Sequence, residues 1–254
     1  MAKQGLLYER PRPVTQSWHA DWSVKRGTGY GFARHVSAAP VAVVEFPIAG
    51  RDHPIIFVEG EGGMTPLVLL GLVEGENLSV DENNAWTGGY IPAFVRRYPF
   101  VLAQDNDTAN YTLCIDEASP ACNSEGDGMP LFDDKGEPSD YLKQQLELSR
   151  EWERARAATA SFCKRLVDLD LLVQQRVQIT NAEGGTSLAG GFSAVDRGKL
   201  RDLSDETVGE LLRSGHMEAI LAHLISLNGL DALGKTLDKR RKQAMQSAEG
   251  AATH

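Results

Sequence analysis

The chain has 254 residues, 42% of them hydrophobic, which suffices for one large domain or two small ones. It carries 35 acidic and 26 basic residues, a net charge of −9, so we expect no binding to nucleic acid or to an anionic membrane surface. Three cysteines argue against a disulfide framework, and no apolar run is long enough to span a bilayer. The residues after Met1 lack the apolar core of a signal peptide, so we expect a soluble, cytoplasmic protein.

Residues 1–135 are predicted to be β-rich, because short runs of β-branched and aromatic residues alternate there with Pro- and Gly-containing turns. One apolar run, 66–72, is an exception, because Thr65 and Pro66 match the N-cap and first turn of a helix. The glycine-rich segment 26–31 lacks the spacing of a phosphate-binding loop, which favours a turn with close backbone approach. The strands predicted in this part are 41–46, 55–59, 100–104 and 111–115.

From Ser139 onward the spacing of the apolar residues changes. Apolar residues then recur every three to four positions, which predicts one amphipathic helix over 140–169, about 45 Å long and capped by Ser139 or Asp140. We expect this helix to lie across the sheet. The face that we expect to be buried carries Leu142, Leu146, Phe162 and Leu166.

The last third of the chain combines a hairpin with short helices. Strands 174–180 and 188–195 flank a turn at 181–185, and Gly190 and Gly191 indicate a bulge. Helices are predicted over 205–213, 216–227 and 230–242, the first capped by Ser204, with a frayed tail over 248–254. We therefore predict one α+β domain over 1–254, with a β-rich part (1–135) and a mainly helical part (136–247).

The densest stretch, 86–100, reads Trp-Thr-Gly-Gly-Tyr-Ile-Pro-Ala-Phe-Val-Arg-Arg-Tyr-Pro-Phe. Pro92 suits the first turn of a helix, and Pro99 requires that helix to end by Arg97 or Tyr98. Because Arg96 and Arg97 are adjacent, their side chains point in different directions, so at most one joins the apolar face.

Residues 90–100 of this stretch resemble the central motif of the bacterial SapC family, which is named after a protein from a locus for a crystalline surface layer. The resemblance implies no agreed activity and no catalytic residue. It suggests a binding or accessory role in the assembly or export of cell-surface components. Further matching segments are 26–33, 69–78, 131–133, 191–196 and 222–227.

Two interpretations of the stretch stay open. In the first, it is a site for a partner protein or a small carboxylate- or phosphate-bearing ligand. In the second, its aromatic residues only pack, and one Arg pairs with an internal acid such as Asp81 or Asp116. An enzyme or enzyme accessory subunit that acts on a small anionic substrate is the alternative function. The candidate binding residues are Trp86, Tyr90, Arg96, Arg97 and Tyr98.

Other motifs carry less chemistry. His19 and Asp21 have the spacing of two iron ligands, but no suitable third histidine follows, so a local turn hydrogen bond is the simpler interpretation. Segment 203–227 has the length of a helix-turn-helix, but its second helix lacks Lys and Arg, which favours a core helix. We expect no bound metal and no cofactor.

Overall fold

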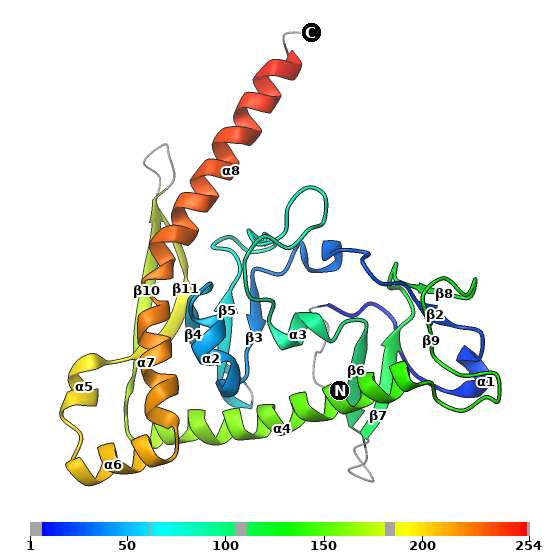
Figure 1. Cartoon of the computed structure of the whole chain (residues 1–254). Helices are drawn as coiled ribbons and strands as arrows, with labels where there is room; N and C mark the ends of the chain where they lie inside the picture. Colours follow the sequence, from blue (N-terminus) through cyan, green and yellow to red (C-terminus); the bar gives the residue numbers. More distant parts are fainter. Residues whose placement is uncertain (1–6, 61, 105–110, 181–185, 253–254) are drawn as a thin grey trace.

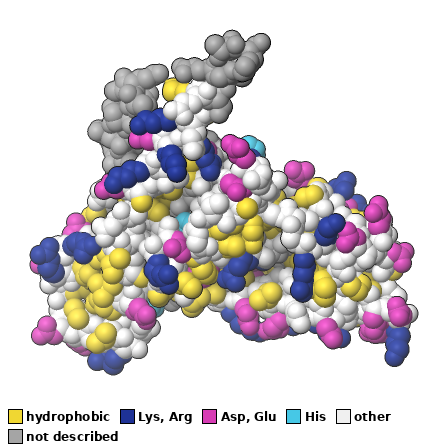
Figure 2. All heavy atoms as spheres, turned by 45° about the horizontal axis from the view of Figure 1, so that its top comes forward, with side chains coloured by type: hydrophobic (Ala, Val, Ile, Leu, Met, Phe, Trp, Pro, Cys, Tyr) yellow, Lys and Arg dark blue, Asp and Glu magenta, His cyan; other side chains and the backbone are white. Residues whose placement is uncertain are grey.

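The structure is a computed structural model that describes residues 7–60, 62–104, 111–180 and 186–252. Antiparallel sheets lie along one long helix, and a group of helices lies at one end (Figure 1). The predicted α+β class is therefore confirmed. Basic and acidic side chains are intermixed on the face that Figure 2 displays.

The larger sheet, among the described residues, has five antiparallel strands in the order β10-β11-β4-β5-β3. The predicted hairpin is present as β10 and β11, and its turn lies outside the described residues. The register passes from Gln175–Phe192 to Val177–Ala189, so two residues of β11, Gly190 and Gly191, face one residue of β10 and form the predicted bulge. The strands are β3 (Ala38–Pro40), β4 (Ile55–Gly60), β5 (Gly63–Leu69), β10 (Leu172–Thr180) and β11 (Thr186–Val195).

Two smaller sheets complete the β-rich part. Strands β6 (Phe100–Gln104) and β7 (Tyr111–Asp116) confirm two predictions, and β1 (Pro11–Pro13) pairs with the free edge of β7. A further sheet joins β2 (Ser23–Val24), β8 (Cys122–Asn123) and β9 (Met129–Pro130).

Helix α4 (Asp140–Asp168) packs against both the five-stranded sheet and the sheet that contains β6 and β7. It has 29 residues, which is about 44 Å, and Ser139 caps it by accepting the Leu142 N–H at 3.1 Å. Phe162 and Leu166 pack in the core of the large sheet, and Leu142 and Leu146 pack in the core of β6 and β7. The predicted apolar face is therefore covered, with Leu146 only half-buried, but it crosses two sheets instead of one.

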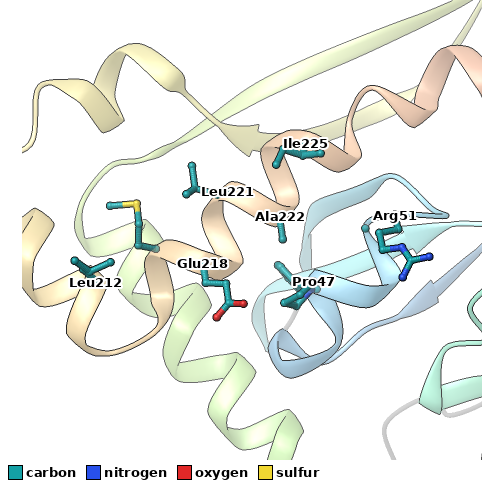
Figure 3. Close-up of a pocket in the computed structure, with 10 residues that line it drawn as sticks. Pro47, Arg51, Leu212, Glu218, Leu221, Ala222 and Ile225 are labelled. Carbon is teal, nitrogen blue, oxygen red and sulfur yellow. The ribbon is translucent and has the colours of Figure 1, made fainter.

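The helical end consists of α5 (Arg197–Arg201), α6 (Asp205–Arg213), α7 (His216–Ser226) and α8 (Gly229–Ala252). Helix α7 packs beside α2 (Phe46–Ala49), as Figure 3 shows, and also contacts β4 and β11. Helix α8 continues to Ala252, beyond the predicted end at 242 and into the segment expected to fray. Arg240 holds it to the body by donating to the carbonyl groups of Asn77, Leu78 and Val80 at 2.9, 3.2 and 3.0 Å.

Two sequence predictions are wrong. Residues 66–72 were expected to be helical, but Pro66 faces Phe57 within β5. Both faces of β5 are apolar because Val68 lies in the main core, while Leu67 and Leu69 pack in a second cluster on the opposite face. A strand covered on both sides has a continuous apolar run, which periodicity does not separate from a buried helix.

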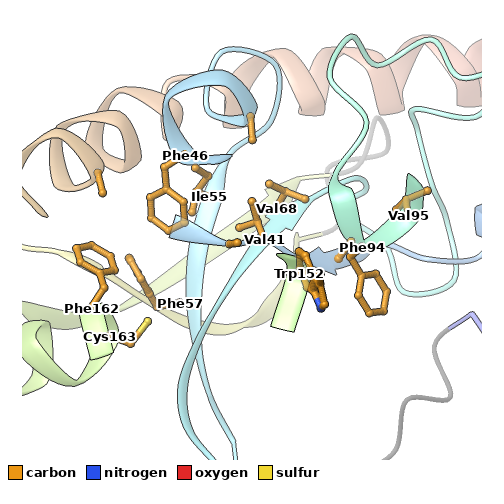
Figure 4. Packing of buried hydrophobic residues seen from close by; sticks show 14 of the residues in the cluster. Val41, Phe46, Ile55, Phe57, Val68, Phe94, Val95, Trp152, Phe162 and Cys163 are labelled. Carbon is orange, nitrogen blue, oxygen red and sulfur yellow. The ribbon is translucent and has the colours of Figure 1, made fainter. Parts of the chain in front are cut away.

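The second wrong prediction is the strand at 41–46. Val43–Glu45 forms a 3-10 turn and Phe46–Ala49 forms α2, because local capping outweighs the β propensity of the valines. The buried Glu45 carboxylate accepts the Ala42 N–H at 2.9 Å, and Pro47 lies in the first turn of α2, where no N–H is required. Figure 4 shows Phe46 of α2 packed near Phe57 and Phe162 in the main core.

Candidate functional site

Residues 86–98 enter the body as an irregular segment and form one short helix, α3 (Ala93–Arg96). Pro92 is its N-cap residue and Arg97 its C-cap residue, so the predicted short helix and its end are confirmed, with Pro92 one position earlier than expected. The peptide bond between Tyr98 and Pro99 is cis, and β6 begins at Phe100. The two Arg side chains thus project from the last turn of α3 and its cap.

A buried carboxylate that the sequence analysis missed, Glu45, anchors this segment. Its Oε1 accepts the Tyr90 hydroxyl at 2.7 Å and the Ala93 N–H at 2.8 Å, while Oε2 accepts the Ala42 N–H. Burial, together with this carboxylate, raises the pKa of Tyr90 to about 12. Tyr90 therefore remains a neutral hydroxyl donor near neutral pH and fixes the start of α3.

Arg96 is the exposed arginine of the pair. Its guanidinium carbon lies 5.5 Å from the centre of the Tyr90 ring, Nη2 donates to the Tyr90 hydroxyl at 3.1 Å, and Nε donates to the Ile91 carbonyl at 2.9 Å. A guanidinium has five N–H groups, so these two bonds leave three N–H groups of this exposed side chain without a partner among the described residues. Arg96 is thus fixed by hydrogen bonds to Tyr90 and Ile91, and its remaining N–H groups are available to bind an anion.

Arg97 is buried, with 6% of its side chain exposed. Its guanidinium carbon lies 4.8 Å from the ring centre of Phe94 and 5.2 Å from that of Trp152, and Nη1 lies 3.9 Å from Glu153 Oε1. The internal partner of this arginine is therefore Glu153 on α4, and not Asp81 or Asp116 as suggested from the sequence. Arg97 ties α3 to the long helix.

Tyr98 and Trp86 belong to a row of aromatic rings. Tyr98 stacks on Phe32 at 4.0 Å between ring centres and donates its hydroxyl to Asp116 at 3.3 Å. Burial raises the pKa of Tyr98. Phe32 neighbours Tyr30, which meets Trp86 edge-on at 5.5 Å. The row therefore joins the motif to the glycine-rich segment near the start of the chain.

The glycines of that segment allow close approach. Gly29 has φ +76°, and a Cβ there would lie 2.7 Å from the Asn84 carbonyl oxygen, while the next N–H, of Tyr30, donates to the same carbonyl at 2.7 Å. The interpretation as a close backbone contact is confirmed.

Trp86 is half-buried, and its ring centre lies 6.1 Å from that of His53. Within the described residues its indole nitrogen is buried without a hydrogen-bond partner. His53 donates from Nε2 to the Tyr90 carbonyl at 2.7 Å, and burial lowers its pKa, so it is neutral at physiological pH. Trp86 and Tyr90 are therefore linked through His53.

The five predicted residues thus fall into different environments. Tyr90 and Arg96 lie together at the surface, Arg97 is internal, and Trp86 and Tyr98 are partly buried in the aromatic row. The acids Glu45 and Glu153 were missed. Their signals were a lone carboxylate in an apolar run and a Glu next to a core Trp on the predicted long helix.

The pair His19 and Asp21 does not form a common site. His19 is buried, its Nδ1 lies 3.3 Å from the Thr15 N–H and carbonyl groups, and its Nε2 lies 3.5 Å from Glu117, whereas Asp21 is exposed. The local turn hydrogen bond predicted for His19 is present. In the described part of the chain, no three His, Cys, Asp or Glu side chains gather as metal ligands.

No helix among the described residues combines the length and apolar composition needed to cross a membrane.

Comparison with known proteins identifies the family of the chain. No curated protein and no solved structure matches the chain. The model of the SapC family matches residues 14–233, which include the 86–98 segment, the glycine-rich segment and the long helix. Because this match covers most of its 254 residues, the chain belongs to the SapC family.

Proposed function

We propose that the protein is a binding or accessory protein that holds a carboxylate- or phosphate-bearing group of a partner at the surface formed by Arg96 and Tyr90. The single observation that carries this proposal is the state of the Arg96 guanidinium, which is exposed, is fixed by two internal hydrogen bonds and has three further N–H groups that meet no acceptor in the described part of the chain. An arginine held in this way loses little conformational entropy when an anion binds, and its planar fork matches carboxylate and phosphate groups.

The surroundings of Arg96 favour binding over catalysis. The nearest acid in its hydrogen-bond chain is Glu45, which is 5% exposed and accepts three hydrogen bonds. A carboxylate engaged in this way is poorly placed to exchange protons with a substrate. The hydroxyl of Tyr90, with a pKa of about 12, is a weak acid. These groups build a rigid support for Arg96.

The family name and the charge of the site support a proposal for the nature of the partner. The family name suggests a component of the cell surface or of the machinery that assembles or exports it, and we place the protein in the cytoplasm, where such a component would be met before export. Tyr90, whose ring lies under the guanidinium, adds an apolar edge beside the anion contact. An acidic segment of a protein suits both features.

A comparative pull-down tests the proposal. Parent protein, Arg96→Ala and Arg154→Ala are immobilised and exposed to the same native lysate, and retained proteins and small molecules are quantified by mass spectrometry. Arg154 is a matched control because it is also an exposed arginine, with 69% of its side chain accessible on α4. We expect a component that the parent and Arg154→Ala retain and that Arg96→Ala loses. Identical retained sets for all three proteins contradict the proposal.

A further inference from the structure

Helix α7 is apolar on two sides, although the residues that the structure describes cover only one of them. Ala219, Ile220 and Leu224 are buried, whereas Leu221 and Ile225 are 46% and 63% exposed. A helix that is apolar all round is typical of a protein interior. Exposed apolar side chains in a contiguous group indicate an interaction surface.

A groove of about 450 Å³ runs beside these residues, between α2 and the pair α6 and α7. Phe46 and Ala222 contribute to its apolar lining, as does Leu212 of α6, which is 68% exposed. Figure 3 shows Glu218 and Ala222 on the side of α7 that faces Pro47, and Arg51 further along the groove. The groove is therefore apolar along its length, with charged residues at its edge.

The charges at this edge are of opposite sign and unpaired. Among the described residues that line the groove, Arg51 and Glu218 carry the charges, both are exposed, and neither side chain has an ion pair or hydrogen bond within the described chain. They lie toward opposite ends of α7. Glu218 is in the first turn, while Gly50, next to Arg51, lies against the last turn, where an added Cβ would be 3.2 Å from Ser226.

We propose that a second copy of this chain covers this face, with the two α7 helices antiparallel across a two-fold axis. A two-fold interface must be self-complementary, because each residue meets its counterpart twice. An antiparallel pairing brings Glu218 of each copy toward Arg51 of the other, and Leu221 and Ile225 of each copy toward the apolar groove of the other. One patch with both charges at opposite ends fits a second copy of itself.

Sedimentation equilibrium of the full chain tests the proposal, with Ile225→Glu as the first variant and Leu148→Glu as its control. Leu148 is 51% exposed and lies on α4, outside the groove. We expect a dimer for the parent and for Leu148→Glu, and a dimer dissociation constant raised at least about tenfold for Ile225→Glu. A monomeric parent, or an Ile225→Glu variant that dimerises like the parent, overturns the proposal.

A charge exchange then tests the pairing. Arg51→Glu and Glu218→Arg each place like charges opposite one another at two points of the interface, and we expect each to raise the dimer dissociation constant by about tenfold or more. The double variant restores opposite charges in reversed order, so its dissociation constant should return toward that of the parent. Failure of the double variant to recover overturns the antiparallel arrangement, and circular dichroism of each variant verifies that it is folded.

Discussion

His223 provides a direct test of how α7 is held on the large sheet. Its imidazole is fully buried, accepts the Val195 N–H at Nε2 at 3.1 Å, and donates from Nδ1 to the Ile55 carbonyl at 2.9 Å. Nε2 accepts a hydrogen bond, so the neutral ring with its proton on Nδ1 fits this arrangement. Protonation would place an N–H of the ring against the N–H of Val195. Burial accordingly lowers the pKa of His223 to about 4.

This shift makes folding stability depend on pH. An ordinary histidine of the unfolded chain binds a proton below a pKa of about 6.5, while the folded state resists protonation until about pH 4. The contribution is therefore fully present above about pH 6.5 and is lost as the pH falls toward 4, because the unfolded state binds more protons over that range. A difference of about 2.5 pKa units corresponds to about 3 kcal/mol, of which about 2.5 kcal/mol is lost by about pH 4.5.

Urea unfolding at about pH 7.5 and about pH 4.5, at one protein concentration, measures this loss. Carboxylates also contribute to acid destabilisation, so the parent is compared with His223→Gln and with His35→Gln, which changes an exposed histidine. We expect His223→Gln to be less stable at the higher pH by about 1–3 kcal/mol, from the unpaired backbone groups. Its loss on acidification should be smaller than that of the parent by about 2.5 kcal/mol. Equal losses in the parent and in His223→Gln would refute the reasoning.

Two further predictions concern the supports of the site. Arg97→Ala removes a buried cation from between two rings, so we expect the free energy of unfolding to fall by about 3 kcal/mol and calorimetry to show a melting temperature about 10 °C lower. Arg96→Ala should change the free energy of unfolding by less than about 1 kcal/mol. Equal melting temperatures of the two variants would show that Arg97 is not structural. Thr159→Val keeps the volume but removes the hydroxyl that accepts the Val43 N–H at 2.8 Å, so urea unfolding should show a loss of about 1–3 kcal/mol, and an unchanged midpoint would contradict that contact.

The sequence predicts elements best where periodicity and capping agree. Helix α4 combines a regular apolar repeat with the Ser139 cap, and the alternating strands β10 and β11 carry the predicted bulge at Gly190 and Gly191, so both elements appear where expected. The apolar run 66–72 predicts a helix, but residues 66–69 form the end of β5, whose two faces are apolar because the sheet is covered on both sides. That covering is a property of the tertiary fold and leaves no local signal.

The site was predictable in part. Adjacent arginines must diverge, so the sequence indicated that one would be internal and one exposed, but it gave no basis for choosing between Arg96 and Arg97. The choice depends on α4, whose Trp152 and Glu153 lie against Arg97 and are distant in sequence. Tyr30 and Phe32, which complete the aromatic row, are likewise distant in sequence from the motif, so the local pattern did not indicate them.

The central claim is that Arg96 binds anionic groups of a partner while Arg97 serves the fold. Calorimetric titration with a short glutamate-rich peptide, and separately with inorganic phosphate, measures it most directly for the parent, Arg96→Ala, Arg96→Lys and Arg154→Ala. We predict that the parent and Arg154→Ala bind at least one probe alike, that Arg96→Ala weakens binding by about tenfold or more, and that Arg96→Lys recovers it only in part, because an ammonium group lacks the planar fork. Binding by neither probe, or equal binding by the parent and Arg96→Ala, would contradict the account.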